Sequence, residues 1–257
     1  MSTELVIENL RFNYRISDVL QDISLTLCSS EILGIIGPNG SGKTTLLKCI
    51  NRILEPKQGK ILLNCKDVRK MKRMDVARNF GYVPQKVHAG FDSPTVFEIV
   101  LMGRRPHNTW KCCHEDHEEV WNVLTQLNIK DLSMRRFDEL SGGQQQKVLI
   151  ARALAQGAKV LLLDEPTSNL DIKHQLEVMK LIKKLVNQKG ISSIVAIHDL
   201  NLASQYCNNL IMIKNGGIFA VGDPLSVLTP SNIKEVYGID VEVGIRQGKP
   251  YIIVLDE

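Results

Sequence analysis

Residues 37–45 read Gly37-Pro38-Asn39-Gly40-Ser41-Gly42-Lys43-Thr44-Thr45, which fits the pattern G-x-x-x-x-G-K-[ST]. The stretch follows an apolar run at residues 32–36 and opens a segment of helical character from Thr44 to Ile50. Its glycines let backbone N–H groups curve around an anion, and the N-terminus of the helix adds a favourable dipole. Lys43 can then reach the β- and γ-phosphates of a nucleotide, and the Thr44 hydroxyl can ligate Mg²⁺. A plain glycine-rich turn is the alternative, and the strand before it and the helix after it argue against that reading.

A second element combines an apolar strand with two acidic residues, and it reads Val160-Leu161-Leu162-Leu163-Asp164-Glu165. Ligands bind at the C-terminal ends of strands in open α/β sheets. A buried Asp is unfavourable unless it meets a cation, so we expect Asp164 to face the Mg²⁺ of a bound nucleotide. Glu165 leaves the strand end in the other direction and is predicted to polarise an attacking water. The alternative is that both acids only cap the turn that follows.

The third element reads Leu140-Ser141-Gly142-Gly143-Gln144 and precedes a predicted helix from Gln144 to Ala155. A Ser before two glycines at a helix start makes a second anion-binding N-terminus. One bound nucleotide does not need two such cradles. If the second cradle serves the γ-phosphate held by a partner's loop, a two-fold dimer contains two composite sites. A Ser N-cap with flexible glycines is the alternative.

Strand-like segments alternate with helical ones over most of the chain. In the middle, Val120, Val123, Leu124 and Leu127 fall at i, i+3, i+4 and i+7 and predict one apolar helix face. Asn215-Gly216 is a strong signal for a type I′ hairpin. The predicted strands are Leu5–Glu8, Ile23–Leu27, Glu31–Ile36, Gly59–Leu63, Asn79–Pro84, Val160–Asp164, Ser192–His198, Leu210–Lys214 and Gly217–Val221, and a further predicted helix is His174–Lys189.

This alternation, together with the phosphate-binding loop, predicts an α/β fold with a P-loop NTPase core. We expect a mostly parallel sheet with helices on both faces, a small antiparallel β subdomain beside it and a helical insertion. The expected organisation is one domain over residues 1–257. Its parts are the P-loop core with the antiparallel layer at 1–84, a helical subdomain at 85–157, the rest of the core at 158–237 and a C-terminal strand extension at 238–257 that contains Tyr251–Leu255.

The composition is that of a globular protein. The chain has 257 residues, of which 44% are hydrophobic and 23% charged, so we expect one or two domains with a full core. The net charge of +4 comes from 32 basic and 28 acidic residues and gives no argument for nucleic-acid binding. No apolar run approaches the roughly 18 residues of a membrane span, and Met1–Leu10 does not have the build of a signal peptide. The six cysteines form no C-x-x-C pair, which favours reduced thiols in a cytoplasm.

These three elements together resemble the motifs of ATP-binding-cassette (ABC) ATPases. Gly37–Thr45 is similar to the Walker A segment, Val160–Asp164 to the Walker B strand and Leu140–Gln144 to the signature loop, in the order that the family has. The resemblance covers nearly the whole chain. It implies an ABC cassette that binds ATP and Mg²⁺, and that hydrolyses ATP between two copies joined head to tail.

Four further residues match the family's pattern one by one. Tyr14 resembles the aromatic residue that stacks on adenine, and Gln85 resembles the glutamine that touches Mg²⁺ or water and links the core to the helical insertion. Asp171 belongs to a segment that resembles the loop communicating across the dimer, and His198 resembles the histidine that contacts the γ-phosphate. Asn169 departs from the family, which usually has Ala there, and this affects the expected rate and dimer affinity but no catalytic group.

Two segments resemble importers of iron chelates, haem and cobalamin: Thr95–His107 and Ile233–Gly238. The resemblance implies a motor for uptake that works with an integral membrane permease and, indirectly, with an extracytoplasmic substrate-binding protein. The chain is then expected at the cytoplasmic face of the membrane as a peripheral subunit, without nucleic acid as a partner. Importers of zinc or manganese are one alternative, and a non-transport cassette acting on nucleic acid or ribosomes is another.

A cluster of soft ligands stands apart from these motifs. Cys112, Cys113, His114 and His117 lie close together in sequence and could bind zinc or iron. The preferred reading is a solvated helix start, because Glu115-Asp116 suits the first turn of a helix.

Overall fold

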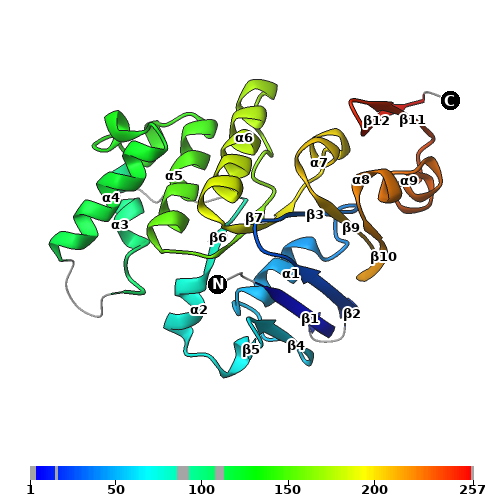
Figure 1. Cartoon of the computed structure of the whole chain (residues 1–257), viewed down its shortest axis with the longest axis horizontal. Helices are drawn as coiled ribbons and strands as arrows, with labels where there is room; N and C mark the ends of the chain where they lie inside the picture. Colours follow the sequence, from blue (N-terminus) through cyan, green and yellow to red (C-terminus); the bar gives the residue numbers. More distant parts are fainter. Residues whose placement is uncertain (1–3, 15–16, 86–92, 108–112, 256–257) are drawn as a thin grey trace.

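The computed structural model describes residues 4–14, 17–85, 93–107 and 113–255. Its centre is a six-stranded sheet in which every neighbouring pair is parallel except the antiparallel pair β9–β10 (Figure 1). The strands, in spatial order, are β10 (Gly217–Gly222), β9 (Asn209–Lys214), β3 (Ile32–Ile36), β8 (Ser192–Ala196), β7 (Val160–Asp164) and β6 (Phe80–Val83). The expected α/β class and mostly parallel sheet are therefore confirmed.

The apolar runs of the central strands bury side chains on both faces of this sheet. Within β3, Ile32 and Ile36 join one core cluster, while Leu33 and Ile35 join the other. The first cluster packs under the helices α5 (Gly142–Ala155), α6 (Ile172–Lys189) and α7 (Leu200–Tyr206), and the second packs against α1 (Lys43–Ile50) and the antiparallel sheet. Strands covered on both faces need this continuous apolar sequence.

The antiparallel sheet has the order β2-β1-β4-β5 and lies on the α1 side of the core (Figure 1). Its strands are β1 (Leu5–Tyr14), β2 (Ser17–Leu27), β4 (Gln58–Leu63) and β5 (Lys66–Asp67). The predictions for β1 and β2, Leu5–Glu8 and Ile23–Leu27, were too short. Asn9 and Asp22 have φ values of 48° and 50° at places where the pairing shifts register, so the alternation that marks a strand is broken there.

The middle of the chain is helical. It contains α3 (Val96–Met102) and α4 (His114–Gln126), which lie beside α5 at one end of the molecule (Figure 1). The four apolar residues predicted to share a helix face are all buried, from Val120 at 0% exposed to Leu127 at 5%. Between the antiparallel sheet and β6 lies α2 (Arg73–Asn79), and short 3₁₀ turns occupy Val68–Lys70, Lys130–Leu132 and Phe137–Glu139.

The C-terminal part adds two helices and a hairpin to the core. These are α8 (Pro224–Val227), α9 (Pro230–Tyr237), β11 (Val241–Arg246) and β12 (Lys249–Val254). The strand predicted at Tyr251–Leu255 begins two residues earlier, and it pairs with β11 in a separate sheet that contacts α7. The predicted turn at Asn215-Gly216 has φ values of 49° and 79°, as a type I′ hairpin needs. No helix within the described residues is both long and apolar enough to cross a membrane.

Candidate functional site

The loop at residues 37–45 joins the end of β3 to α1, which begins one residue earlier than predicted, at Lys43. All three of its glycines have positive φ values, 150° at Gly37, 79° at Gly40 and 108° at Gly42. A Cβ at Gly37 would lie 2.4 Å from the carbonyl oxygen of Ile213, and one at Gly42 would lie 2.9 Å from that of Val19. Neighbouring backbone therefore leaves no room for side chains at these two positions. No described side chain caps the first turn of α1, so the amides there remain available to an anion.

Lys43 is buried at the base of this loop, at 5% exposed. Its ammonium donates to the carbonyl oxygens of Gly37 at 2.8 Å and Pro38 at 3.0 Å. Burial lowers the pKa of Lys43 below its ordinary value, and the carboxylates of Glu165 and Asp164 act in the opposite direction. The loop thus holds its cation beside the anion-binding amides, with two acidic side chains close by. The hydroxyl of Ser41 is buried within the same loop and has no described partner.

Asp164, at the end of β7, accepts two hydrogen bonds from different elements. The Thr44 hydroxyl on α1 donates to its Oδ1 at 2.8 Å, and the Tyr82 hydroxyl on β6 donates to its Oδ2 at 3.0 Å. Asp164 is 3% exposed. A hydroxyl and a carboxylate this close together at the C-terminal edge of a sheet are the hard oxygen ligands that suit Mg²⁺. The oxygen ligands of Thr44 and Asp164 therefore fit the Mg²⁺ ion that the sequence motifs imply.

Tyr82 is a site residue that sequence reasoning missed. It lies on β6, whose parallel pairing with β7 puts Tyr82 opposite Leu162, two residues before Asp164. Burial raises the pKa of its phenol far above the ordinary value, so the group keeps its proton and remains a donor. The sequence does place a tyrosine in a predicted strand. That this strand lies beside the strand ending at Asp164 depends on the strand order of the sheet, which the sequence pattern does not give.

Glu165 follows β7 directly and has a left-handed φ of 51°. Gln85 donates from Nε2 to its Oε2 at 2.5 Å, and the Nε2 of His198 contacts its Oε1. These residues come after the ends of β6, β7 and β8, which are adjacent in the sheet. His198 does not close the strand as predicted, because β8 ends at Ala196. The structure thus brings Gln85, Glu165 and His198 together.

The second predicted cradle lies at the start of α5, which begins at Gly142 instead of Gln144. Ser141 accepts from the backbone N–H of Gln144 at 3.4 Å and donates its own N–H to the Gln144 side chain at 3.0 Å, forming a capping box. Asp171 caps α6, which begins at Ile172 and not at His174, and it accepts from the backbone N–H of His174 at 2.8 Å. A Cβ added at either cradle glycine would approach this second helix start, at Leu170 just before its N-cap or at His174 in its first turn.

The contact between the two helix starts predicts unequal effects of two similar substitutions. A Cβ at Gly143 would lie 2.6 Å from the His174 ring, whereas one at Gly142 would lie 3.0 Å from the flexible end of Leu170. Both changes to Ala gain the same helix propensity, so their difference reports the clash. We expect Gly143→Ala to lower the free energy of unfolding by about 1–3 kcal/mol relative to Gly142→Ala. Urea denaturation of both variants measures this, and equal midpoints would contradict it.

Tyr14 lies at the end of β1 and is 49% exposed. Its ring meets that of Phe12 edge to face, with centroids 4.8 Å apart. The hairpin partner β2 contacts the phosphate-binding loop through Val19, whose carbonyl oxygen faces Gly42. An aromatic face therefore remains open on the hairpin that borders the loop.

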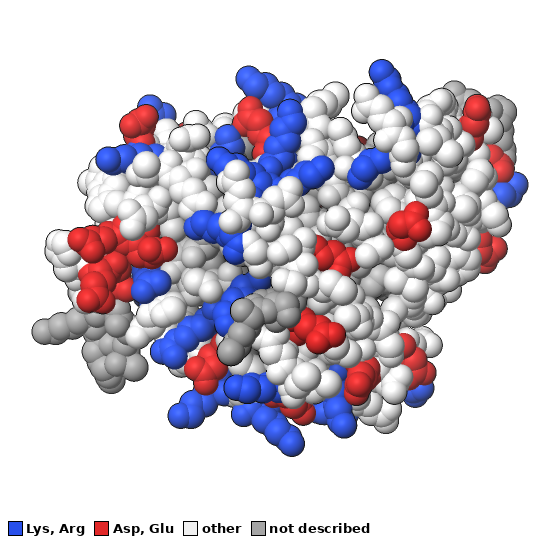
Figure 2. Space-filling view, in the orientation of Figure 1, with Lys and Arg blue, Asp and Glu red and all other residues white. Residues whose placement is uncertain are grey.

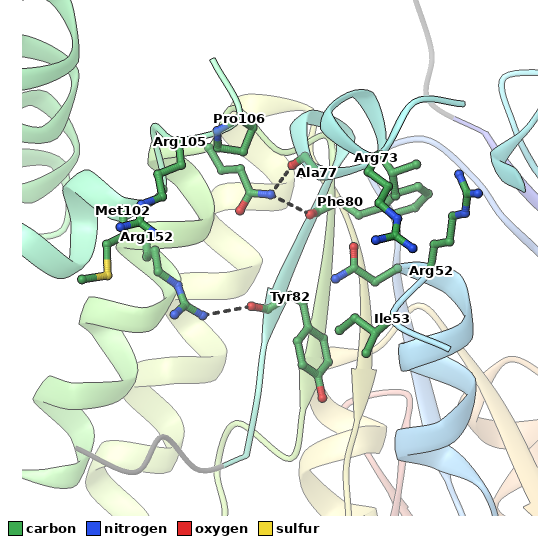
Figure 3. A pocket seen from close by; sticks show the side chains of 14 residues that line it. Arg52, Ile53, Arg73, Ala77, Phe80, Tyr82, Met102, Arg105, Pro106 and Arg152 are labelled. Atoms are coloured by element: carbon green, nitrogen blue, oxygen red, sulfur yellow. Dashed lines mark hydrogen bonds between the residues drawn. The ribbon is translucent and has the colours of Figure 1, made fainter. Parts of the chain in front are cut away.

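A cavity of about 630 Å³ lies between α1 and α2 on one side and α3 and α5 on the other, with β6 at its base. Among the described residues, its lining carries the cations Arg52, Arg73, Arg105 and Arg152 and no acidic side chain. Figure 3 shows Arg152 reaching the carbonyl oxygen of Tyr82, while the phenol of Tyr82 points away from the arginines. Further Lys and Arg side chains gather over α2 and β5 (Figure 2). The cavity suits an anionic or carbonyl-rich partner.

The cysteine and histidine cluster has other contacts. His114 pairs with Glu118 at 3.3 Å, and the His117 ring packs against Phe97 with centroids 5.5 Å apart. Asp116 accepts from the Cys113 backbone N–H at 3.0 Å. Over the described part of the chain, no group of three or more His, Cys, Asp or Glu side chains could hold a metal ion, and Cys112 lies outside that part.

Comparison with known proteins identifies the family. Residues 20–168 match the family model described as ABC transporter. An uncharacterised ABC transporter ATP-binding protein of Methanocaldococcus jannaschii is 45% identical over 249 residues, which is 97% of each chain. The iron(3+)-hydroxamate import ATP-binding protein FhuC of Bacillus subtilis is 37% identical and covers 97% of this chain and 94% of its own.

Among solved structures, a putative metal-chelate type ABC transporter in an inward-facing conformation superimposes with a TM-score of 0.86. It is 30% identical and covers 99% of this chain and 98% of its own. Fold, motifs and relatives agree. This chain belongs to the ATP-binding proteins of the ABC transporter family and is an ATPase.

Proposed function

We propose that this chain energises the uptake of an iron chelate, haem or a cobalamin-type compound through a separate membrane permease. The observation that carries the hydrolytic part is the meeting of Thr44, Asp164 and Glu165 at one edge of the sheet, beside Lys43. The importer class is supported by the similarity to FhuC and to the metal-chelate type transporter. The sequence segments Thr95–His107 and Ile233–Gly238 point to the same class.

Each site residue has a proposed role in hydrolysis. The amides of residues 37–45 and the Lys43 ammonium bind the phosphates, and Tyr14 stacks on the adenine. Mg²⁺ bound with ATP supplies charge neutralisation at the β- and γ-phosphates. Thr44, Asp164 and the amide oxygen of Gln85 would hold that ion. The carboxylate of Glu165 orients the attacking water, and the His198 imidazole contacts the γ-phosphate.

The complete site requires a second copy of the chain. The second cradle is the anion-binding start of α5, made of Ser141, Gly142, Gly143 and Gln144. The two side-chain hydrogen bonds of its capping box join Ser141 and Gln144 to each other. In a two-fold dimer this cradle would face the γ-phosphate held by the partner, and Asp171 would lie near the same interface. Two ATP molecules then join the two copies.

The permease is proposed to dock at the arginine-lined cavity. Met102, Gly103, Arg105 and Pro106 line it, and all four belong to the segment that resembles metal-chelate importers. A cytoplasmic permease segment that carries acidic side chains complements the cavity's charge. This contact would keep the chain at the cytoplasmic face of the membrane as a peripheral subunit. A substrate-binding protein would act on the outer side of the membrane, without touching this chain.

The test is to trap the complex and identify its membrane component. Tagged Glu165→Gln chain is bound to native membranes with Mg-ATP, and the copurifying proteins are identified. We expect a multi-spanning permease, and we expect Arg73→Glu with Arg105→Glu to lower its yield at least about tenfold by replacing attraction with repulsion. Lys180→Glu with Lys184→Glu on α6 is the matched control.

Recovery of nucleic acid or ribosomes without a permease would contradict the transport function. The isolated complex in vesicles then distinguishes ferric hydroxamate, haem and cobalamin from zinc and manganese as cargo.

A further inference from the structure

We infer that Tyr82 is a positioning residue for the metal-binding carboxylate, an assignment that rests on the proposed role of Asp164. The two oxygens of Asp164 receive different donors, Thr44 on Oδ1 at 2.8 Å and Tyr82 on Oδ2 at 3.0 Å. The two donors come from different elements, one from α1 and one from β6. Together they fix the rotation of the carboxylate about its last side-chain bond.

Tyr82 is itself rigidly placed. It lies in β6, which pairs with β7 from Phe80 to Val83, so the two strands hold the phenol and the carboxylate in one register. Its carbonyl oxygen accepts from the Arg152 guanidinium at 3.4 Å, and its ring turns to the other side (Figure 3). The hydroxyl therefore reaches Asp164 from a fixed backbone and not from a flexible loop.

The Thr44 hydroxyl alone cannot fix the carboxylate in the same way. A single hydrogen bond to one oxygen leaves the carboxylate free to turn about that contact, whereas bonds to both oxygens define its plane. Partners that orient a metal-binding group typically change metal affinity about 10–100-fold when they are removed. The aromatic ring of Tyr82 packs against the second core cluster, so Tyr82→Phe removes the donor and keeps the packing.

The experiment measures metal binding without turnover. Glu165→Gln chain with bound ATP is titrated with Mn²⁺, and free Mn²⁺ is followed by its electron paramagnetic resonance signal. Adding Tyr82→Phe is expected to weaken Mn²⁺ binding about tenfold, the lower end of that range, because the phosphates also hold the ion. ATP binding without metal and the melting temperature are expected to stay unchanged. In the chain that retains Glu165, the loss of hydrolysis should be recovered at raised Mg²⁺.

Two further variants separate the possible outcomes. Tyr206→Phe removes the hydroxyl of another buried tyrosine, on α7, and is expected to leave Mn²⁺ binding unchanged. Asp164→Asn tests the proposed function itself. If Asp164→Asn abolishes Mn²⁺ binding while Tyr82→Phe leaves it intact, the role of Tyr82 is wrong and the metal site stands. If Asp164→Asn has no effect, the metal role of Asp164 fails, and the role of Tyr82 fails with it.

Discussion

Replacing Glu165 with Gln is expected to lower ATP turnover about 10²–10⁴-fold while ATP binding persists. The carboxylate at this position accepts from Gln85 and contacts His198, so it is held where the strands β6, β7 and β8 end. A Gln side chain keeps the size and an accepting oxygen but has no charge to attract the proton of an attacking water. The loss should therefore fall on kcat and not on the affinity for ATP.

Single-turnover hydrolysis and ATP binding by equilibrium dialysis measure the two effects separately. Glu177→Gln is the matched control, because Glu177 on α6 pairs with Lys147 on α5 at 2.8 Å and has no proposed role in hydrolysis. We expect it to hydrolyse ATP at nearly the unchanged rate. Turnover by Glu165→Gln within a few-fold of the unmodified chain would show that another group orients the water.

Two inactive variants are expected to restore each other's activity when they are mixed. Lys43→Ala removes a buried cation that the loop holds with two carbonyl oxygens. Each hydrogen bond to a charged group contributes about 1.5–3 kcal/mol, so the change also removes part of what holds the loop in place. Ser141→Asp keeps an N-cap residue at the start of α5 and places a negative charge against the partner's γ-phosphate. Each change alone should lower hydrolysis at least about 10²-fold.

In a mixed dimer of these two chains, both changes fall in the same composite site. The other site then combines an intact Lys43 with an intact Ser141, so part of the activity returns. Steady-state hydrolysis is followed as the two proteins are mixed at a constant total concentration. Ser141→Asn, a neutral N-cap, is the control and should remain active. A mixture no more active than its components would exclude sites shared between copies.

The strands of the central sheet were predicted well because each is marked by a continuous apolar run in the local sequence. The run ending at Asp164 is apolar throughout, and β7 is buried throughout, with the same bounds as predicted. The predictions for β1 and β2 were too short, because Asn9 and Asp22 take left-handed conformations that break the alternation. Local patterning cannot reveal a register shift that only the neighbouring strand compensates.

The site was predictable where a motif carries chemistry and hidden where tertiary pairing creates it. Two motifs pointed to Thr44 and Asp164, which lie 2.8 Å apart from Oγ1 to Oδ1, and a metal ion between them stays a prediction. Tyr82 had no such pattern, because its contact with Asp164 depends on β6 lying next to β7. The arginine-lined cavity draws its walls from segments between Asn51 and Gln156, and no window of sequence contains them together.

The backbone conformation at Glu165 sets folding stability against the catalytic role proposed for this residue. A φ of 51° is unfavourable by about 1–2 kcal/mol for a residue with a Cβ, and Gly and Asn tolerate it best. Neither of these supplies a carboxylate. A library randomised at this codon and selected only for soluble expression would therefore accumulate Gly and Asn. With Glu165 in its proposed role, the same library selected for ATP hydrolysis would return to Glu at this strained position.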